Sequence, residues 1–139
     1  MELPPITSSQ NRQVTLVRRY LTRPKECRRE QLLVADGIHL AQEAMRAGLS
    51  CRALFISTDD RDPEIAALVD EATRARLPVY RALPHIFRSI SPVETPQGVV
   101  GIFGRPQFDR NRVWGLKAER GVHLAVGHGI QDPTNIGSL

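Results

Sequence analysis

Short apolar runs alternate with helical patterns along most of the chain, and this alternation limits the folds that the sequence can adopt. The runs are too uniformly apolar to face water on one side, so each indicates a strand buried on both faces. The segments between them carry apolar residues at helical spacing. We therefore predict an α/β protein, a three-layer α/β/α sandwich with helices on both faces of the sheet. The predicted strands are residues 31–35, 52–58, 78–80 and 98–103.

Helix-capping and helix-breaking residues mark the ends of the predicted helices. Asp62 followed by Pro63 is a typical N-terminal signal, because aspartate caps the first turn and proline fits within it. Pro24 is expected to end the first helix, since a proline inside a helix removes a backbone donor. Four helices are predicted in this way. One begins after Ser8 or Ser9, a second covers residues 38–47 and is stopped by Gly48, a third begins at Pro63, and a fourth covers residues 83–90.

A change in composition divides the chain. Residues 104–121 interrupt the alternation with proline, asparagine and basic residues around the single tryptophan, Trp114, and are the best candidate for a linker. Residues 122–130 indicate a further buried strand, followed by a turn toward a helix that the sequence does not supply, so we expect a piece of a longer protein. The predicted parts are a loose lead-in over residues 1–10, a domain over 11–105, a linker over 106–121, and the start of a second domain over 122–139.

Positive charge is concentrated near the N-terminus. Between residues 12 and 29, seven Arg and Lys residues accompany one acidic residue, Glu26, which gives this segment a charge of +6 against +4 for the whole chain. A helix that merely faces solvent normally mixes both signs. Arginine suits RNA, because its planar fork binds phosphate in a bidentate way and stacks on unpaired bases. The residues predicted to contact RNA in this segment are Arg12, Arg18, Arg19, Arg28 and Arg29.

Other classes of protein are disfavoured by the composition. No apolar stretch approaches the roughly 20 residues that span a bilayer, and the first ten residues have no signal or transit pattern, so the expected location is the cytoplasm. Cys27 and Cys51 are too far apart for a zinc or redox motif. We expect two reduced thiols and no metal site.

Three stretches, in their order and spacing, resemble the SpoU/TrmH family of RNA ribose 2′-O-methyltransferases. In that family a strand, an acidic-Gly turn and a helix begin an N-terminal RNA-binding domain, a loop and a final strand complete it, and a Gln-Asp-Pro-x-Asn motif opens the catalytic domain. The matching residues are 33–40, 91–100 and 131–139. Two positions depart from the family pattern: Asp36 stands where glutamate is more common, and Thr134 where glycine is common.

The resemblance implies a fold and an activity. The first domain would share the fold of ribosomal proteins that bind kinked RNA, and residues 122–139 would supply the first strand of an incomplete trefoil-knot domain, where Asn135 helps to arrange the active site. The complete enzyme would transfer a methyl group from S-adenosylmethionine to a ribose of rRNA or tRNA, and would form a homodimer through the knotted domains. The catalytic arginine and the cofactor site would lie beyond Leu139, so we expect this chain to bind RNA without catalysis.

The residues themselves indicate where RNA would lie. The turn at Asp36 and Gly37 opens a helix whose first backbone N–H groups can meet a phosphate, and His39 is in that first turn. Gly37 would equally suit an ordinary strand-to-helix turn, and His39 a solvated surface position. For residues 95–98 we favour a plain turn that ends at Gly98.

Two alternative functions remain open from the sequence. A stand-alone RNA-binding module explains the basic segment equally well, but it has no use for residues 124–139. A nucleotide-binding α/β enzyme is the remotest interpretation, because no glycine-rich phosphate loop follows the first strand.

Overall fold

The computed structural model describes residues 4–91, 93, 95–109, 111 and 126–129. The chain divides into two compact units, Met1–Pro106 and Gln107–Leu139, and the helices and strands named below lie in the first. Of the predicted strand over 122–130, residues 126–129 are described and are not in a strand; the rest of it, Asn135, and most of the predicted linker lie outside the described residues.

A four-stranded mixed sheet forms the centre of the first unit, with the strand order β1-β4-β2-β3. The last strand, β4, lies between β1 and β2 and is antiparallel to both, whereas β2 and β3 are parallel. The elements are α1 Arg12–Thr22, α2 Pro24–Arg29, β1 Leu32–Asp36, α3 Ile38–Arg46, β2 Cys51–Ser57, α4 Pro63–Arg74, β3 Val79–Ala82, α5 Pro84–Arg88 and β4 Val99–Gly104.

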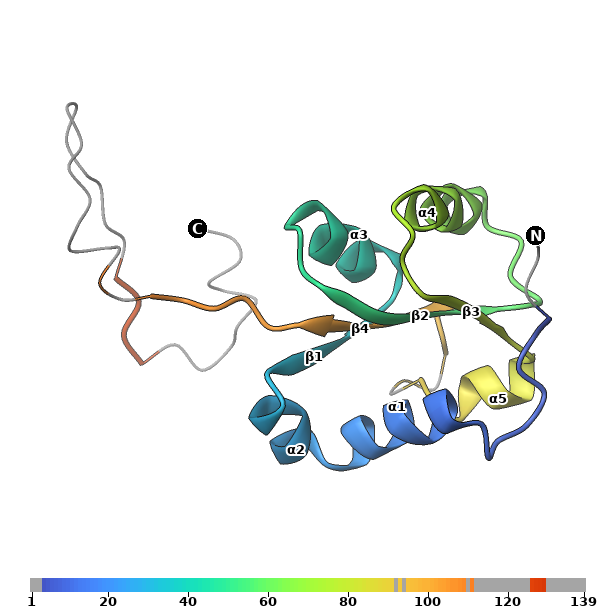
Figure 1. Ribbon diagram of the computed structural model, residues 1–139, viewed down its shortest axis with the longest axis horizontal. Helices are drawn as coiled ribbons and strands as arrows, with labels where there is room; N and C mark the ends of the chain where they lie inside the picture. Colours follow the sequence, from blue (N-terminus) through green and yellow to red (C-terminus); the bar gives the residue numbers. More distant parts are fainter. Residues whose placement is uncertain (1–3, 92, 94, 110, 112–125, 130–139) are drawn as a thin grey trace. The chain divides into compact units, whose positions relative to one another are not determined.

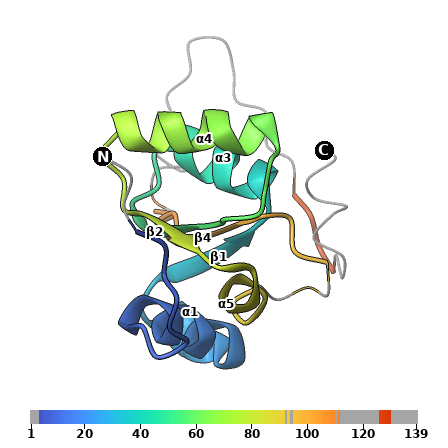
Figure 2. The same cartoon turned by 90° about the vertical axis from the view of Figure 1, so that its right-hand side faces the viewer.

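Helices form a layer on each side of this sheet. α3 and α4 cover one face, and α1, α2 and α5 cover the other (Figure 1, Figure 2). Because neighbouring side chains of a strand point to opposite faces, Leu54 of β2 packs in the core under α3 and α4, whereas Phe55 packs against α1 and α5. The predicted α/β fold with helices on both faces of the sheet is confirmed.

Local chemistry explains where most helices begin and end. The Asp62 carboxylate accepts a hydrogen bond from the backbone N–H of Glu64 at 2.8 Å, so the predicted cap of α4 is confirmed. Gly48, at φ +67°, follows α3, and its N–H donates to the carbonyl of Met45. This left-handed glycine ends α3 as predicted.

The N-terminal helices differ from the prediction. The cap of α1 is Asn11, whose side-chain oxygen accepts from the N–H of Gln13 at 2.9 Å, and not Ser8 or Ser9. The Ser8 hydroxyl is instead used in the preceding turn, where it accepts from the N–H of Gln10. Pro24 follows the end of α1 but also begins α2, because the first turn of a helix needs no proline N–H.

The strands place several loops at one end of the sheet, which we call the carboxyl end. The carboxyl ends of β1, β2 and β3 and the amino end of β4 lie there, since β4 is antiparallel to β1 and β2. The opposite end, where β1 begins and β4 ends, is the amino end. Among the described residues, no helix is long and apolar enough to span a membrane.

We predict that a chain shortened to residues 1–106 folds cooperatively, because both hydrophobic cores are built from residues between Ile6 and Phe103. Its free energy of unfolding in urea should differ from that of the full chain by less than about 1 kcal/mol, the usual range for changes outside a core. A broad transition without a folded baseline would contradict the proposed boundary.

Candidate nucleic-acid interface

Loops distant in sequence are hydrogen-bonded together at the carboxyl end of the sheet. The N–H of Gly37, after β1, donates to the carbonyl of Val99 at 2.9 Å, and the N–H of Ser57, at the end of β2, donates to the carbonyl of Gly98 at 3.0 Å. The hydroxyl of Ser91 donates to the Asp36 carboxylate at 3.4 Å. The segment before β4 therefore closes over the ends of β1 and β2.

Gly37 is placed where only glycine fits well. Its φ is +95°, and a Cβ atom built on it would lie 2.3 Å from Oε1 of Gln97. The absence of a side chain thus lets the Gln97 carboxamide lie against the turn that opens α3. Residues 95–98, which the sequence indicated as a plain turn, form one feature with Gly37.

The amino end of α3 offers unpaired donors at this feature. Gly37 is its N-cap and makes no side-chain capping bond, and no acidic residue lies in the first turn. His39 and Leu40 of that turn are exposed. The first backbone N–H groups of a helix carry partial positive charge, so this surface suits a phosphate.

Asp36 is the acidic residue of the same turn. Burial raises the pKa of its carboxyl group, and the hydrogen bond from Ser91 opposes that shift. The ionised form of Asp36 is therefore less favourable in the folded protein than that of an exposed aspartate.

Two arginines of the basic segment are held by the fold. Arg18 donates to the hydroxyl of Ser89 at 2.9 Å, which joins α1 to the end of α5. Arg19 pairs with Glu30 at 2.9 Å and with Glu26 at 3.5 Å, and its guanidinium lies over the ring of Tyr20. The sequence window that ended at residue 29 excluded Glu30, so it missed this network.

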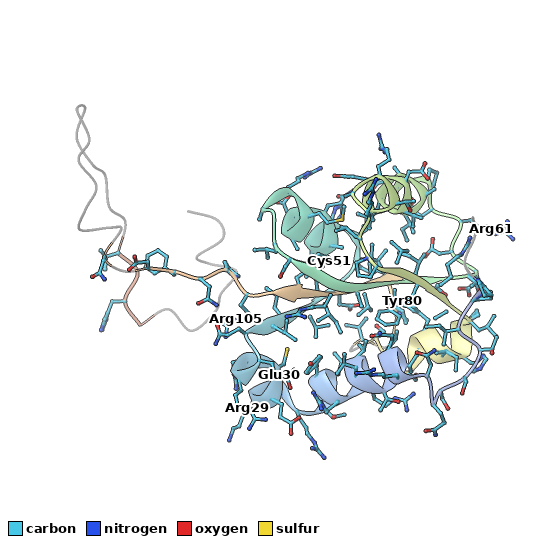
Figure 3. The ribbon with its side chains drawn as sticks, viewed as in Figure 1. Arg29, Glu30, Cys51, Arg61, Tyr80 and Arg105 are labelled. Carbon is cyan, nitrogen blue, oxygen red and sulfur yellow. The ribbon has the colours of Figure 1, made fainter. Side chains whose placement is uncertain are left out.

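The structure does not bring all predicted contact residues to one place. Arg12, Arg28 and Arg29 are exposed. Arg28 and Arg29 belong to α2, which leads directly into the start of β1 and so lies at the amino end of the sheet. Figure 3 shows Arg29 and Arg105 on one side of the domain and Arg61 on the other. Gly37 and His39, at the carboxyl end, are separated from Arg28 and Arg29 by the length of the sheet.

Other arginines at the carboxyl end were missed by the sequence analysis. Arg61 and Arg88, both exposed, border a cavity of about 360 Å³ that also contacts Gly98. They come from the loop after β2 and from α5, and each is isolated in sequence. Only the convergence of loops at this end of the sheet brings them together.

Metal and thiol chemistry finds no support at this surface. In the described part of the chain, no three His, Cys, Asp or Glu side chains gather so that they could hold a metal ion. Cys27 and Cys51 form no disulfide. Burial raises the pKa of Cys51 to about 11 and also raises that of Cys27, so neither is an activated nucleophile.

Comparison with known proteins gives one family match. Residues 11–101 match the family described as MRM3-like substrate binding domain. No protein with a curated description matches the chain.

Solved structures share the fold. They include an rRNA methyltransferase from Sinorhizobium meliloti (23% identity over 76% of this chain, TM-score 0.61) and a protein described as an RNA 2′-O ribose methyltransferase (18% over 97%, TM-score 0.65). A third is the SpoU methyltransferase AviRb from Streptomyces viridochromogenes in complex with AdoMet (16% over 74%, TM-score 0.59). This chain spans 38%, 49% and 36% of their lengths, respectively. The matches confirm the resemblance to the SpoU family.

We predict that Gly37→Ala destabilises the protein more than Gly48→Ala. Both residues have positive φ. Gly48→Ala should cost about 1 kcal/mol of unfolding free energy, and Gly37→Ala about 1–3 kcal/mol, because φ +95° with ψ 159° is a conformation that essentially only glycine adopts. Only at Gly37 does the new Cβ also meet another side chain. Urea unfolding should show that Gly37→Ala loses more unfolding free energy than Gly48→Ala does, and that this excess becomes smaller when Gln97→Ala is added. Equal losses for the two glycine variants would refute the close contact with Gln97.

The second prediction concerns pH. The folded-state pKa of Asp36 is raised, so the folded chain binds its proton at higher pH than the unfolded chain does, and the ionised group costs stability at neutral pH. That cost disappears as the pH falls through the raised pKa. The stability of the wild type relative to Asp36→Asn should therefore rise between neutral pH and about pH 4. The exposed Glu71→Gln is the charge-matched control, and an unchanged difference for Asp36→Asn would contradict the assignment.

Proposed function

The chain belongs to the family of MRM3-like substrate-binding domains, and we propose that it binds RNA at the carboxyl end of its sheet as part of an RNA ribose 2′-O-methyltransferase. The observation that carries this proposal is the uncapped start of α3, where Gly37 and Gln97 meet. A phosphate can accept hydrogen bonds from the first turn of α3. The Gln97 carboxamide beside it offers both a donor and an acceptor to an unpaired base.

Basic side chains flank this point on two sides. Arg88 and Arg61 border the cavity next to Gly98, which Asp59 and Asp60 also line, and Arg18 is fixed to Ser89, the residue after Arg88. Exposed His39 lies on the first turn of α3. These groups come from α1, α3, α5 and the loop after β2, so together they suit a folded or kinked RNA better than a straight strand.

The basic segment of α1 and α2 extends the proposed contact. Arg12, Arg28 and Arg29 are exposed, whereas Arg19 is engaged with Glu30. An RNA that reaches Arg28 and Arg29 as well as Gly37 has to run along the α1 side of the domain. We assign these three arginines to phosphate contact and Arg19 to the support of α1 against α2.

For the complete protein we propose methyl transfer from S-adenosylmethionine to a ribose 2′-hydroxyl of rRNA or tRNA in the cytoplasm. AdoMet is bound in the AviRb structure. No residue of the domain over 11–105 is proposed to bind that cofactor. Asn135, proposed to help arrange the active site, and the proposed homodimer contact belong to the catalytic part. A stand-alone RNA-binding module would use the same surface, and methyltransferase activity of the complete protein separates the two functions.

We predict that the double variant Gln97→Ala/Arg88→Ala binds an rRNA fragment with an internal loop about tenfold more weakly than the wild type does. If Arg88 contacts a phosphate, the slope of log affinity against log salt should also fall by about 0.7 to 1. Fluorescence anisotropy at several salt concentrations measures both quantities.

The control is Arg52→Ala/Arg74→Ala, which removes two exposed arginines from β2 and the end of α4, one positive charge more than the test variant loses. It should weaken binding less than about twofold, because these residues lie away from the proposed surface. Equal losses for the two double variants would show that the carboxyl end of the sheet is not the RNA site. If RNA affinity were unchanged in the triple variant Arg12→Ala/Arg28→Ala/Arg29→Ala, the basic segment would be excluded as an RNA contact.

A further inference from the structure

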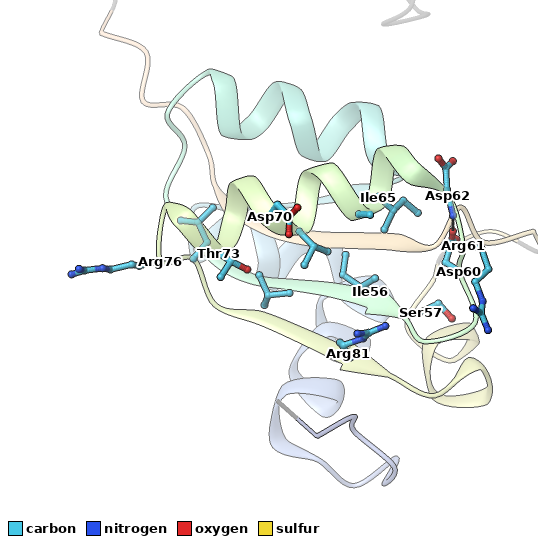
Figure 4. Close-up of a pocket in the computed structure, with 14 residues that line it drawn as sticks. Ile56, Ser57, Asp60, Arg61, Asp62, Ile65, Asp70, Thr73, Arg76 and Arg81 are labelled. Carbon is cyan, nitrogen blue, oxygen red and sulfur yellow. Dashed lines mark hydrogen bonds between the residues drawn. The ribbon is translucent and has the colours of Figure 1, made fainter. Parts of the chain in front are cut away.

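A second, larger cavity lies between α4 and the edge strand β3. Its volume is about 550 Å³, within the range of pockets that enclose small organic ligands. Figure 4 shows it opening between the helix and the strand. Apolar side chains from β2, α4, the α4–β3 connection and β3 line it: Ile56, Ile65, Val69, Leu77 and Val79.

Polar groups border this apolar lining. Asp70 and Thr73 project from α4, and Arg81 extends along β3 toward Ser57, whereas Arg76 points away from the cavity (Figure 4). Arg81 is half-buried. The cavity therefore combines an apolar surface with a carboxylate acceptor and the flat face of a guanidinium.

The lining of this cavity carries charges of both signs. Arg61 and Arg81 stand against three aspartates, since Arg76 points away (Figure 4), and two of the aspartates already accept hydrogen bonds from backbone donors. Asp60 accepts from the N–H of Asp62 at 2.9 Å, and Asp62 accepts from the N–H of Glu64 at 2.8 Å. Asp60 and Asp62 also disfavour a phosphate at their end of the cavity. A flat, uncharged ring with donors and acceptors on its edge fits this lining best, and a nucleobase has that chemistry.

The cavity is continuous with the surface proposed to bind RNA. Ser57, Asp60 and Arg61 line both this cavity and the smaller one, and the smaller one reaches Pro96 and Gly98 on either side of Gln97. A nucleotide next to the one bound at Gln97 therefore has a direct route past Arg61 to the apolar lining.

We propose that the α4–β3 cavity receives one unpaired nucleobase of the RNA, an inference that rests on the proposed function. The base packs on the side chains of Val69 and Val79 and stacks beside the Arg81 guanidinium. The Asp70 carboxylate accepts from the donors on the edge of the base. The phosphates of that nucleotide stay outside the cavity, in solvent and away from Asp60 and Asp62.

The test compares two RNAs that differ in one base. The first is a stem with an asymmetric internal loop that contains one unpaired adenine, and the second is the same RNA with an abasic site at that nucleotide. The wild-type chain should bind the first about tenfold more tightly, since stacking of one base contributes roughly 1–3 kcal/mol. Adenosine monophosphate alone is the third probe, followed through the NMR shifts of the Val69 and Val79 methyl groups.

Matched variants on α4 decide whether the cavity causes the preference for the adenine RNA over the abasic RNA. Ala66 lines the cavity and Ala67 does not, although both are exposed. Ala66→Phe should lower the affinity for the adenine RNA to that for the abasic RNA, and Ala67→Phe should leave the tenfold difference intact. Asp70→Asn, with Glu71→Gln as its control, repeats the comparison without a change in volume, and it should reduce the difference at least threefold.

The outcomes separate this inference from the proposed function. Equal affinity for the two RNAs, or a difference that survives both Ala66→Phe and Asp70→Asn, overturns the cavity proposal and leaves RNA binding at Gln97 standing. Shifts with adenosine monophosphate but no preference between the RNAs would make the cavity a site for free nucleotides and also overturn it. Failure of the wild type to bind either RNA overturns both proposals.

Discussion

The pairing of β4 with both β1 and β2 is the interaction on which the rest of the domain depends. β4 is the last strand in sequence but occupies an inner position, and its residues Val99, Val100, Ile102 and Phe103 are fully buried. Val100 and Ile102 belong to the core beneath α1 and α5, and Val99 and Phe103 to the core beneath α3 and α4. Each core therefore requires this strand. The same pairing holds residues 97 and 98 against Gly37 and Ser57, so the candidate RNA surface exists only when β4 is in place.

Local signals were sufficient to predict most of the elements. Apolar runs predicted the four strands, and the Asp62-Pro63 pair and Gly48 predicted helix ends, because each acts on a backbone only a few residues away. α2 buries only one residue, Cys27, so it shows no apolar pattern and was missed. The choice of Asn11 over Ser8 as a cap depends on a turn that competes for the serine hydroxyl, which the order of residues does not reveal.

The candidate site was less predictable because it is assembled from distant segments. Gly37 and His39 were identified from the strand-to-helix turn, but the role of Gln97 depends on a contact across 60 positions of sequence. Counting charge along the chain emphasised residues 12–29, whereas the fold engages Arg19 with Glu30 and places Arg61 and Arg88 beside Gly98. Proximity in sequence and proximity in space coincide for charges on one helix, and not for charges on converging loops.

The inner position of β4 also bears on how the protein is made. A polypeptide leaves the ribosome from its N-terminus, and a domain whose last segment closes its centre cannot complete its sheet until that segment has emerged. Before Gly104 is outside, β1 has no neighbour, because β4 is its partner in the sheet. β2 and β3 can pair earlier, as they are parallel and joined by α4. Synthesis therefore first exposes a two-stranded α/β unit with an open β2 edge, a stage at which chaperones have an apolar strand to bind.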